Sequence, residues 1–171
     1  MNKRPIDVTA YADTITKALR RGVFLTTKAK DKVNSMVIGW GHIGRIWERD
    51  VFIAYVRDCR FTRELLDQNP AFTVNVPLGA IDRNAFALCG TKSGRDMDKI
   101  AAAGLTLVPP DVFDVPAIKE FPLTLECRVI YREAQDATRL PAEIRKKFYT
   151  IETDDHIAYY GEIAAAYLIE D

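Results

Sequence analysis

The sequence contains few of the residues that bind metal ions or form disulfide frameworks. Its 171 residues include three cysteines and two histidines. Cys59, Cys89 and Cys127 form no close pair, their number is odd, and no secretory signal precedes them, so we expect reduced thiols. Two histidines do not complete a zinc site with such scattered cysteines. The sequence therefore predicts neither disulfides nor a metal centre.

Long apolar runs and an excess of one charge are also missing. No segment approaches the roughly 20 apolar residues of a membrane span, and the opening MNKRPIDVTAYADT has no apolar stretch of a secretory signal. Lysine and arginine together number 24, as do aspartate and glutamate, so the formal net charge is zero. Such a balance draws the molecule neither to nucleic acid nor to anionic lipid. We expect a cytoplasmic protein without a nucleic-acid or membrane partner.

Common catalytic and nucleotide-binding motifs are absent from the sequence. It contains no G-x-S-x-G, no H-E-x-x-H, no Walker phosphate loop and no dinucleotide-binding G-x-G-x-x-G. These absences weaken the hydrolase and Rossmann dehydrogenase hypotheses. The composition, with 48% hydrophobic, 28% charged and 10% aromatic residues, is that of an ordinary globular protein, and its length suits one domain over residues 1–171.

The pattern along the chain predicts many strands and few helices. Runs rich in strand-forming residues cover residues 23–27, 34–40, 47–56, 71–76, 105–108, 123–131 and 157–169. Helices are expected over residues 9–21, after Thr62, over residues 93–104 and over residues 141–148. Short strands without regular βαβ alternation favour a closed antiparallel sheet. We therefore expect a mainly β fold, a small barrel with peripheral helices.

One candidate anion site lies in the segment from Ser93 to Lys99. Ser93 followed by Asp96 fits a capping box, and the N-terminus of a helix binds anions. The Ser93 hydroxyl and the cations Arg95 and Lys99, one turn apart, could hold a phosphate there. The alternative is a surface helix whose charged side chains form solvated pairs.

A second candidate anion site follows the strand that ends near Val56. The sequence Arg57-Asp58-Cys59-Arg60-Phe61-Thr62 brings two guanidinium groups and a helix cap to the end of a strand. Such a place is common for anion recognition. An exposed basic loop is the alternative.

A third candidate segment runs from Asn34 to Trp40. Its polar residues precede Gly39, where a flat ring could approach the backbone, and Trp40 offers an aromatic wall. The alternative is a plain core strand with Met36, Ile38 and Trp40 on one face.

Two further residues are candidates for chemistry. His156 lies beside Asp154 and Asp155, so it could donate a proton or hold a substrate; a hydrogen-bonded histidine at a strand start is the alternative. Cys89 could be a reactive thiolate only if nearby positive charge lowered its pKa. An inert buried cysteine is the alternative.

Taken in order, five segments resemble one known family. The segments N-S-M-V-I-G-W, Y-V-R-D-C-R-F-T-R-E-L, F-T-V-N-V, C-G-T-K-S-G-R-D-M-D-K and H-I-A-Y-Y-G-E-I, from about Ala18 to Tyr167, resemble the flavin reductase-like family, and its flavoredoxin branch in particular. The resemblance implies a six-stranded Greek-key split β-barrel as a single flavin reductase-like domain. It also implies a homodimer with FMN bound non-covalently near the subunit interface.

The resemblance also implies which residues contact the flavin. The flavin-contacting strand is matched by Asn34, Ser35, Met36 and Trp40; the ribityl and phosphate loop by Arg57, Arg60 and Thr62; and the third segment by Cys89, Gly90, Ser93, Gly94, Arg95 and Lys99. One departure is Val37, which stands where the family often has a threonine.

The function implied is redox chemistry at the flavin ring, where the protein binds, orients and tunes the cofactor. The leading hypothesis is an NAD(P)H-dependent reductase that transfers hydride to FMN, with His156 as a candidate catalytic residue. The alternative is a flavoredoxin-like carrier that a partner protein reduces. A third possibility is a binding module that has lost its cofactor.

Overall fold

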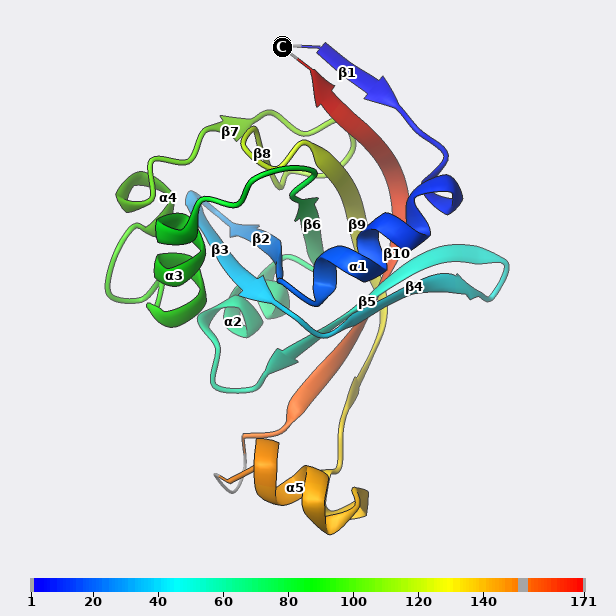
Figure 1. Ribbon diagram of the computed structural model, residues 1–171, viewed down its shortest axis with the longest axis vertical. Helices are drawn as coiled ribbons and strands as arrows, with labels where there is room; N and C mark the ends of the chain where they lie inside the picture. Colours follow the sequence, from blue (N-terminus) through cyan, green and yellow to red (C-terminus); the bar gives the residue numbers. More distant parts are fainter. Residues whose placement is uncertain (1, 151–153, 171) are drawn as a thin grey trace.

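One strongly curved antiparallel sheet carries most of the fold (Figure 1). The computed structural model describes residues 2–150 and 154–170. Within them, the sheet has the strand order β3-β2-β6-β9-β10-β5-β4, and β1 pairs with β10. Its strands are β1 (Asn2–Pro5), β2 (Val23–Ala29), β3 (Lys32–Ile38), β4 (Gly41–Ile46), β5 (Arg49–Arg57), β6 (Ala71–Val76), β9 (Leu123–Ala134) and β10 (His156–Glu170). A separate pair joins β7 (Leu107–Val108) to β8 (Ala117–Ile118).

The sheet closes because one edge strand runs directly into the other. The edge strand β3 ends at Ile38 and β4 begins at Gly41, and the Tyr55 amide of β5 donates to the Trp40 carbonyl at 3.4 Å. A Cβ at Gly41 would lie 2.9 Å from Phe52 Cζ, so this corner requires glycine. The predicted mainly β split barrel is confirmed. Its sheet has eight strands in the described residues rather than six, because β1 and β4 extend it.

Strand β6 shows how the barrel interior is filled. All six of its residues are buried, and Phe72, Val74 and Val76 belong to the main core. On the opposite face, Thr73 Oγ1 donates to the Pro116 carbonyl at 2.8 Å. Both faces of β6 are therefore covered, as expected for a strand inside a barrel wall.

The helices lie around the barrel (Figure 1). In the described residues they are α1 (Ala12–Leu19), α2 (Phe61–Gln68), α3 (Arg83–Thr91), α4 (Lys99–Ala102) and α5 (Ala142–Phe148), with short 3-10 turns η1 (Val8–Tyr11) and η2 (Ala137–Arg139). Helices α3 and α4 lie near β3, whereas α5 lies at the far end of β9 and β10. None of the helices in this part of the chain is long and apolar enough to cross a membrane.

The helix predicted over residues 93–104 was wrong at its start. No helix begins at Ser93; its hydroxyl accepts a hydrogen bond from the Arg95 amide at 3.1 Å within a turn. The helix begins at Lys99 because Asp98 caps it, accepting from the amides of Ile100 and Ala101. The sequence analysis also missed α3 and β4. Asp82 caps α3 in the same way, through the amides of Asn84 and Ala85.

Candidate functional site

Three cavities form a continuous row beside β3. The first, of about 100 Å³, shares Met36 and Arg60 with the second, of about 170 Å³. The second shares Gly39, Trp40 and Tyr55 with the third, of about 440 Å³. The row therefore runs from the turn before α4, past the barrel corner, to α5.

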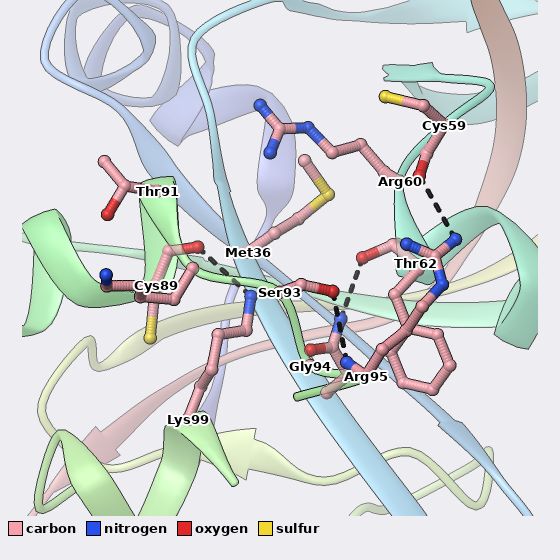
Figure 2. Close-up of a pocket in the computed structure, with 13 residues that line it drawn as sticks. Met36, Cys59, Arg60, Thr62, Cys89, Thr91, Ser93, Gly94, Arg95 and Lys99 are labelled. Carbon is pink, nitrogen blue, oxygen red and sulfur yellow. Dashed lines mark hydrogen bonds between the residues drawn. The ribbon is translucent and has the colours of Figure 1, made fainter. Parts of the chain in front are cut away.

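The first cavity contains a buried lysine. Lys99 is 5% exposed, and its Nζ donates to the Cys89 carbonyl at 3.2 Å (Figure 2). Burial lowers its pKa, the Cys89 thiol opposes that shift, and the positive charge of Arg60 adds to it. No carboxylate of the described residues pairs with it. A buried cation without an anion is costly, so the first cavity is suited to an anionic ligand.

The same cavity contains an unsatisfied hydrogen-bond acceptor. Asn34 is 2% exposed; its Nδ2 donates to Thr62 Oγ1 at 2.9 Å, while its Oδ1 has no hydrogen-bond partner. The backbone at Gly94 passes so close that an added Cβ would overlap Asn34 Oδ1 and lie 2.9 Å from Phe61 Cδ1. Such a buried acceptor is suited to a donor on a ligand.

The two arginines nearest the first cavity differ in their partners. Arg60 lines the first and second cavities, and its guanidinium has no hydrogen-bond or ion-pair partner in the described part of the chain. Arg95 lies at the rim, where its Nε donates to Glu64 Oε1 at 3.1 Å and its Nη2 to the Cys59 carbonyl at 3.2 Å. Among the described residues that line this cavity, Arg60, Lys92 and Lys99 are therefore the cations without a carboxylate partner, and of these Lys99 is the buried one.

The second cavity is walled by two aromatic rings that lie tilted against each other. The rings of Trp40 and His156 lie 4.6 Å apart at an angle of 38°. His156 Nδ1 lies 3.0 Å from the hydroxyl of Tyr149. Burial, and then the positive charge of Arg57, lower the pKa of His156 to about 4, so the imidazole is neutral at neutral pH. The wall can stack on a flat ring and offer it one imidazole nitrogen.

The third cavity is mainly aromatic and apolar. Trp40 and Phe148, which both line it, meet edge to face at 5.2 Å, and Tyr55, Leu140, Ile144 and Tyr149 add to its lining. Gln135 supplies a polar group: its Oε1 lies 3.3 Å from the Tyr149 hydroxyl. The sequence analysis missed this cavity, because only the fold brings α5 to Trp40.

Most predicted site residues line the first two cavities. Those that do are Asn34, Met36, Trp40, Arg57, Arg60, Thr62, Cys89, Ser93, Gly94, Arg95, Lys99 and His156. The side chain of Ser35 points the other way, because side chains alternate along β3, and its hydroxyl lies 3.0 Å from Thr26 Oγ1. Gly90 lies in α3 near Val37. Burial raises the pKa of the Cys89 thiol, which favours an inert cysteine.

The buried imidazole of His156 should have a pKa below the usual value for histidine. Its pKa falls from 6.5 to about 4 on folding, so between these values the folded state binds fewer protons. The contribution of His156 to stability therefore falls as the pH falls through that window. NMR signals of the imidazole C–H groups, assigned with a His42→Asn variant, should show a neutral His156 at about pH 6. A His156 pKa of about 6.5 would contradict the burial of the ring.

Known proteins share this architecture. A family model described as "Flavin reductase like domain" matches residues 18–171. Flavoredoxin from Methanosarcina acetivorans is 27% identical, with 87% of this chain and 68% of that chain covered and a TM-score of 0.66. An FMN-binding domain of a flavin reductase-like enzyme from Shewanella baltica OS155 is 17% identical, with 98% and 77% covered and a TM-score of 0.67.

A further solved structure is the NADH:FAD oxidoreductase SgcE6 of Streptomyces globisporus C-1027, in complex with NAD and FAD fragments. It is 16% identical, with 86% of this chain and 74% of that chain covered and a TM-score of 0.65. At such identities the Shewanella and Streptomyces structures show the fold alone. The family model spans most of the chain, and so the chain belongs to the flavin reductase-like domain family.

Proposed function

We propose that this protein is an NAD(P)H-dependent FMN oxidoreductase that holds FMN non-covalently along the first and second cavities. The observation that carries the proposal is the buried Lys99, which has no carboxylate partner among the described residues and faces the first cavity. A phosphate there would neutralise the buried charge. Cytoplasmic location and a redox partner protein stay predictions from the sequence.

The residues of the two cavities fit the parts of FMN in order. Lys99 and Arg60 would hold the phosphate, and the unsatisfied Asn34 Oδ1 would accept from a ribityl hydroxyl. Met36 and Trp40 would contact the ring in the second cavity. The backbone at Gly94 passes where a side chain would displace Asn34, so glycine keeps that acceptor in place.

Bound FMN supplies the redox chemistry, because its ring accepts hydride at N5. The side chains of this protein would bind FMN and orient its ring. Trp40 would fix the plane of a flavin ring in the second cavity, and the neutral His156 adds no positive charge beside that ring at neutral pH. The third cavity opens next to the position proposed for the ring, where a second substrate would react.

The third cavity supports a nicotinamide as that second substrate. Its volume of about 440 Å³ and its aromatic walls suit a flat ring, and the Gln135 carboxamide can hydrogen-bond an amide. The likeness to SgcE6, whose structure contains NAD and FAD fragments, supports the same proposal. A second candidate function is an electron carrier that a partner protein reduces, which the likeness to the Methanosarcina flavoredoxin supports.

The function test is an anaerobic spectrum of the protein loaded with FMN. We expect NADH or NADPH to bleach the bound flavin bands within seconds, because the third cavity admits the donor next to the ring. Flavin that stays bound and oxidised with both donors would favour the carrier. Failure of the protein to bind FMN would reject the proposed cofactor and with it the proposed function.

Replacing the buried lysine tests the phosphate position. Lys99→Met should weaken FMN binding about 10- to 100-fold, because a charge-assisted hydrogen bond contributes about 1.5–3 kcal/mol. Thermal melting of the flavin-free variant should show no loss of stability, because a buried cation without a counter-ion is removed. Flavin fluorescence titration measures the affinity, and Lys17→Met, which changes an exposed lysine of α1, is the matched control. Wild-type FMN affinity in Lys99→Met would reject this placement.

We also propose that the protein is a homodimer that uses an exposed aromatic patch. The patch comprises Trp47, Tyr131 and Tyr160, whose rings lie 5.2–5.9 Å apart. Trp47 is 54% exposed and, like Glu48, has a positive φ in the β4–β5 turn. A tryptophan held in that conformation and left in solvent is unfavourable for an isolated chain.

Sedimentation equilibrium tests the patch. The wild-type protein should sediment as a dimer and Trp47→Glu as a monomer, because a charge in an apolar interface is costly. Val112→Glu, at a side chain that is 52% exposed elsewhere on the surface, should remain dimeric. A monomeric wild-type protein, or a dimeric Trp47→Glu, would overturn the assignment.

A further inference from the structure

Arg57 and Arg60 lie three residues apart, yet their guanidinium groups serve different parts of the molecule. Arg57 Nη1 donates to the Asp154 carbonyl at 3.0 Å and to Asp154 Oδ2 at 3.3 Å, and Nη2 donates to the Phe148 carbonyl at 2.5 Å. Its guanidinium carbon lies 5.4 Å from the centre of the Tyr149 ring. In the described residues, these contacts go to the end of α5, to Tyr149 just after it and to Asp154 before β10. Arg57 also lines the second cavity but not the first.

We call residues 137–149, which contain η2, α5 and Tyr149, the cap; with Trp40 and Tyr55 they line the third cavity. Besides Arg57, the cap is attached by the Ala137 amide, which donates to Asp155 Oδ2 at 3.2 Å, by the Tyr149 hydroxyl and by the contact of Phe148 with Trp40. Helix α5 has no buried residue, so burial of apolar side chains contributes little to holding it. Phe148 is the last residue of α5, and its carbonyl is among those that a helix end leaves without an intrahelical partner. The Arg57 guanidinium donates a hydrogen bond to that carbonyl.

The position of Arg57 is itself fixed by the barrel. Arg57 is the last residue of β5 and is directly opposite His156 in the register of β5 and β10. Asp154, which accepts from Arg57, also accepts from the Cys59 amide at 3.1 Å. The guanidinium is thus held between the rigid strand and the cap, and the Tyr149 hydroxyl reaches His156 from the cap side.

We propose that Arg57 is a positioning residue, which fixes the cap over the third cavity and so sets the affinity for the second substrate, while Arg60 serves the flavin. The proposal rests on the proposed function, in which FMN fills the first two cavities. It separates two arginines that the sequence resemblance assigns together to the ribityl and phosphate loop. Arg60, without a partner in the described residues and lining both flavin cavities, is free for a phosphate.

Paired variants test this division. In Arg57→Met the affinity for FMN should fall less than in Arg60→Met, because Arg57 lines only the second cavity and its donors are already paired, whereas KM for the reducing nicotinamide rises about tenfold, with a smaller change in kcat. In the matched Arg60→Met the FMN dissociation constant should rise about tenfold or more, with little change in that KM at saturating FMN. Arg57→Lys keeps the charge but reaches fewer acceptors, so its KM should lie between those of the wild type and Arg57→Met.

A measurement on flavin-free protein keeps the test independent of activity. The His156 pKa of about 4 should rise toward 6.5 in Arg57→Lys, because a loosened cap exposes the ring while the nearby positive charge is kept. In Arg57→Met the loss of that charge adds to the rise, so Arg57→Lys is the variant that reports on the cap. If the wild type does not bind FMN, the proposed function fails, while this titration still decides whether Arg57 holds the cap.

Two results would overturn the proposal. FMN binding in Arg57→Met as weak as in Arg60→Met would make Arg57 a flavin ligand. A wild-type KM in Arg57→Met together with a wild-type His156 pKa in Arg57→Lys would show that the cap does not depend on Arg57.

Discussion

The corner between β3 and β4 is the constraint on which both the barrel and the candidate site depend. At Gly39 and Trp40 the chain leaves one edge of the sheet and enters the other, and the Trp40 carbonyl accepts from the amide of Tyr55. Closure at this point also brings the Trp40 ring against His156, at the start of β10. The corner that joins the two edge strands of the sheet therefore also builds the wall of the second cavity.

The least favourable local features of the fold lie together in the first cavity. A cation is buried there without a carboxylate, an amide oxygen has no partner, and the backbone at Gly94 passes too close for a side chain. Each of these features lowers the stability of the ligand-free protein. Their concentration at one place is typical of a preorganised binding site rather than of a structural core.

The row of cavities changes in character along its length, which suggests an order of ligands. Cations line the first cavity, the tilted rings of Trp40 and His156 the second, and mainly aromatic and apolar side chains the third. In the proposed function, the flavin spans the first two and the donor enters the third. The two arginines at the end of β5 follow the same division, since Arg60 lines the first two cavities and Arg57 holds the cap.

The sequence by itself determined the strand character of the chain, the family and most of the lining residues. Strand β6 was predicted at its observed bounds from the alternation of Phe72, Val74 and Val76, but that pattern predicted burial on one face, whereas the fold buries both. Partners from distant segments leave no such pattern. Only the tertiary structure decided that Ser93 closes a turn while Asp98 caps α4, that Arg95 pairs with Glu64, and that Phe148 and Tyr149 wall the third cavity. Local spacing specifies periodicity and candidate caps, whereas the choice among competing hydrogen-bond partners depends on which segments the closed barrel brings together.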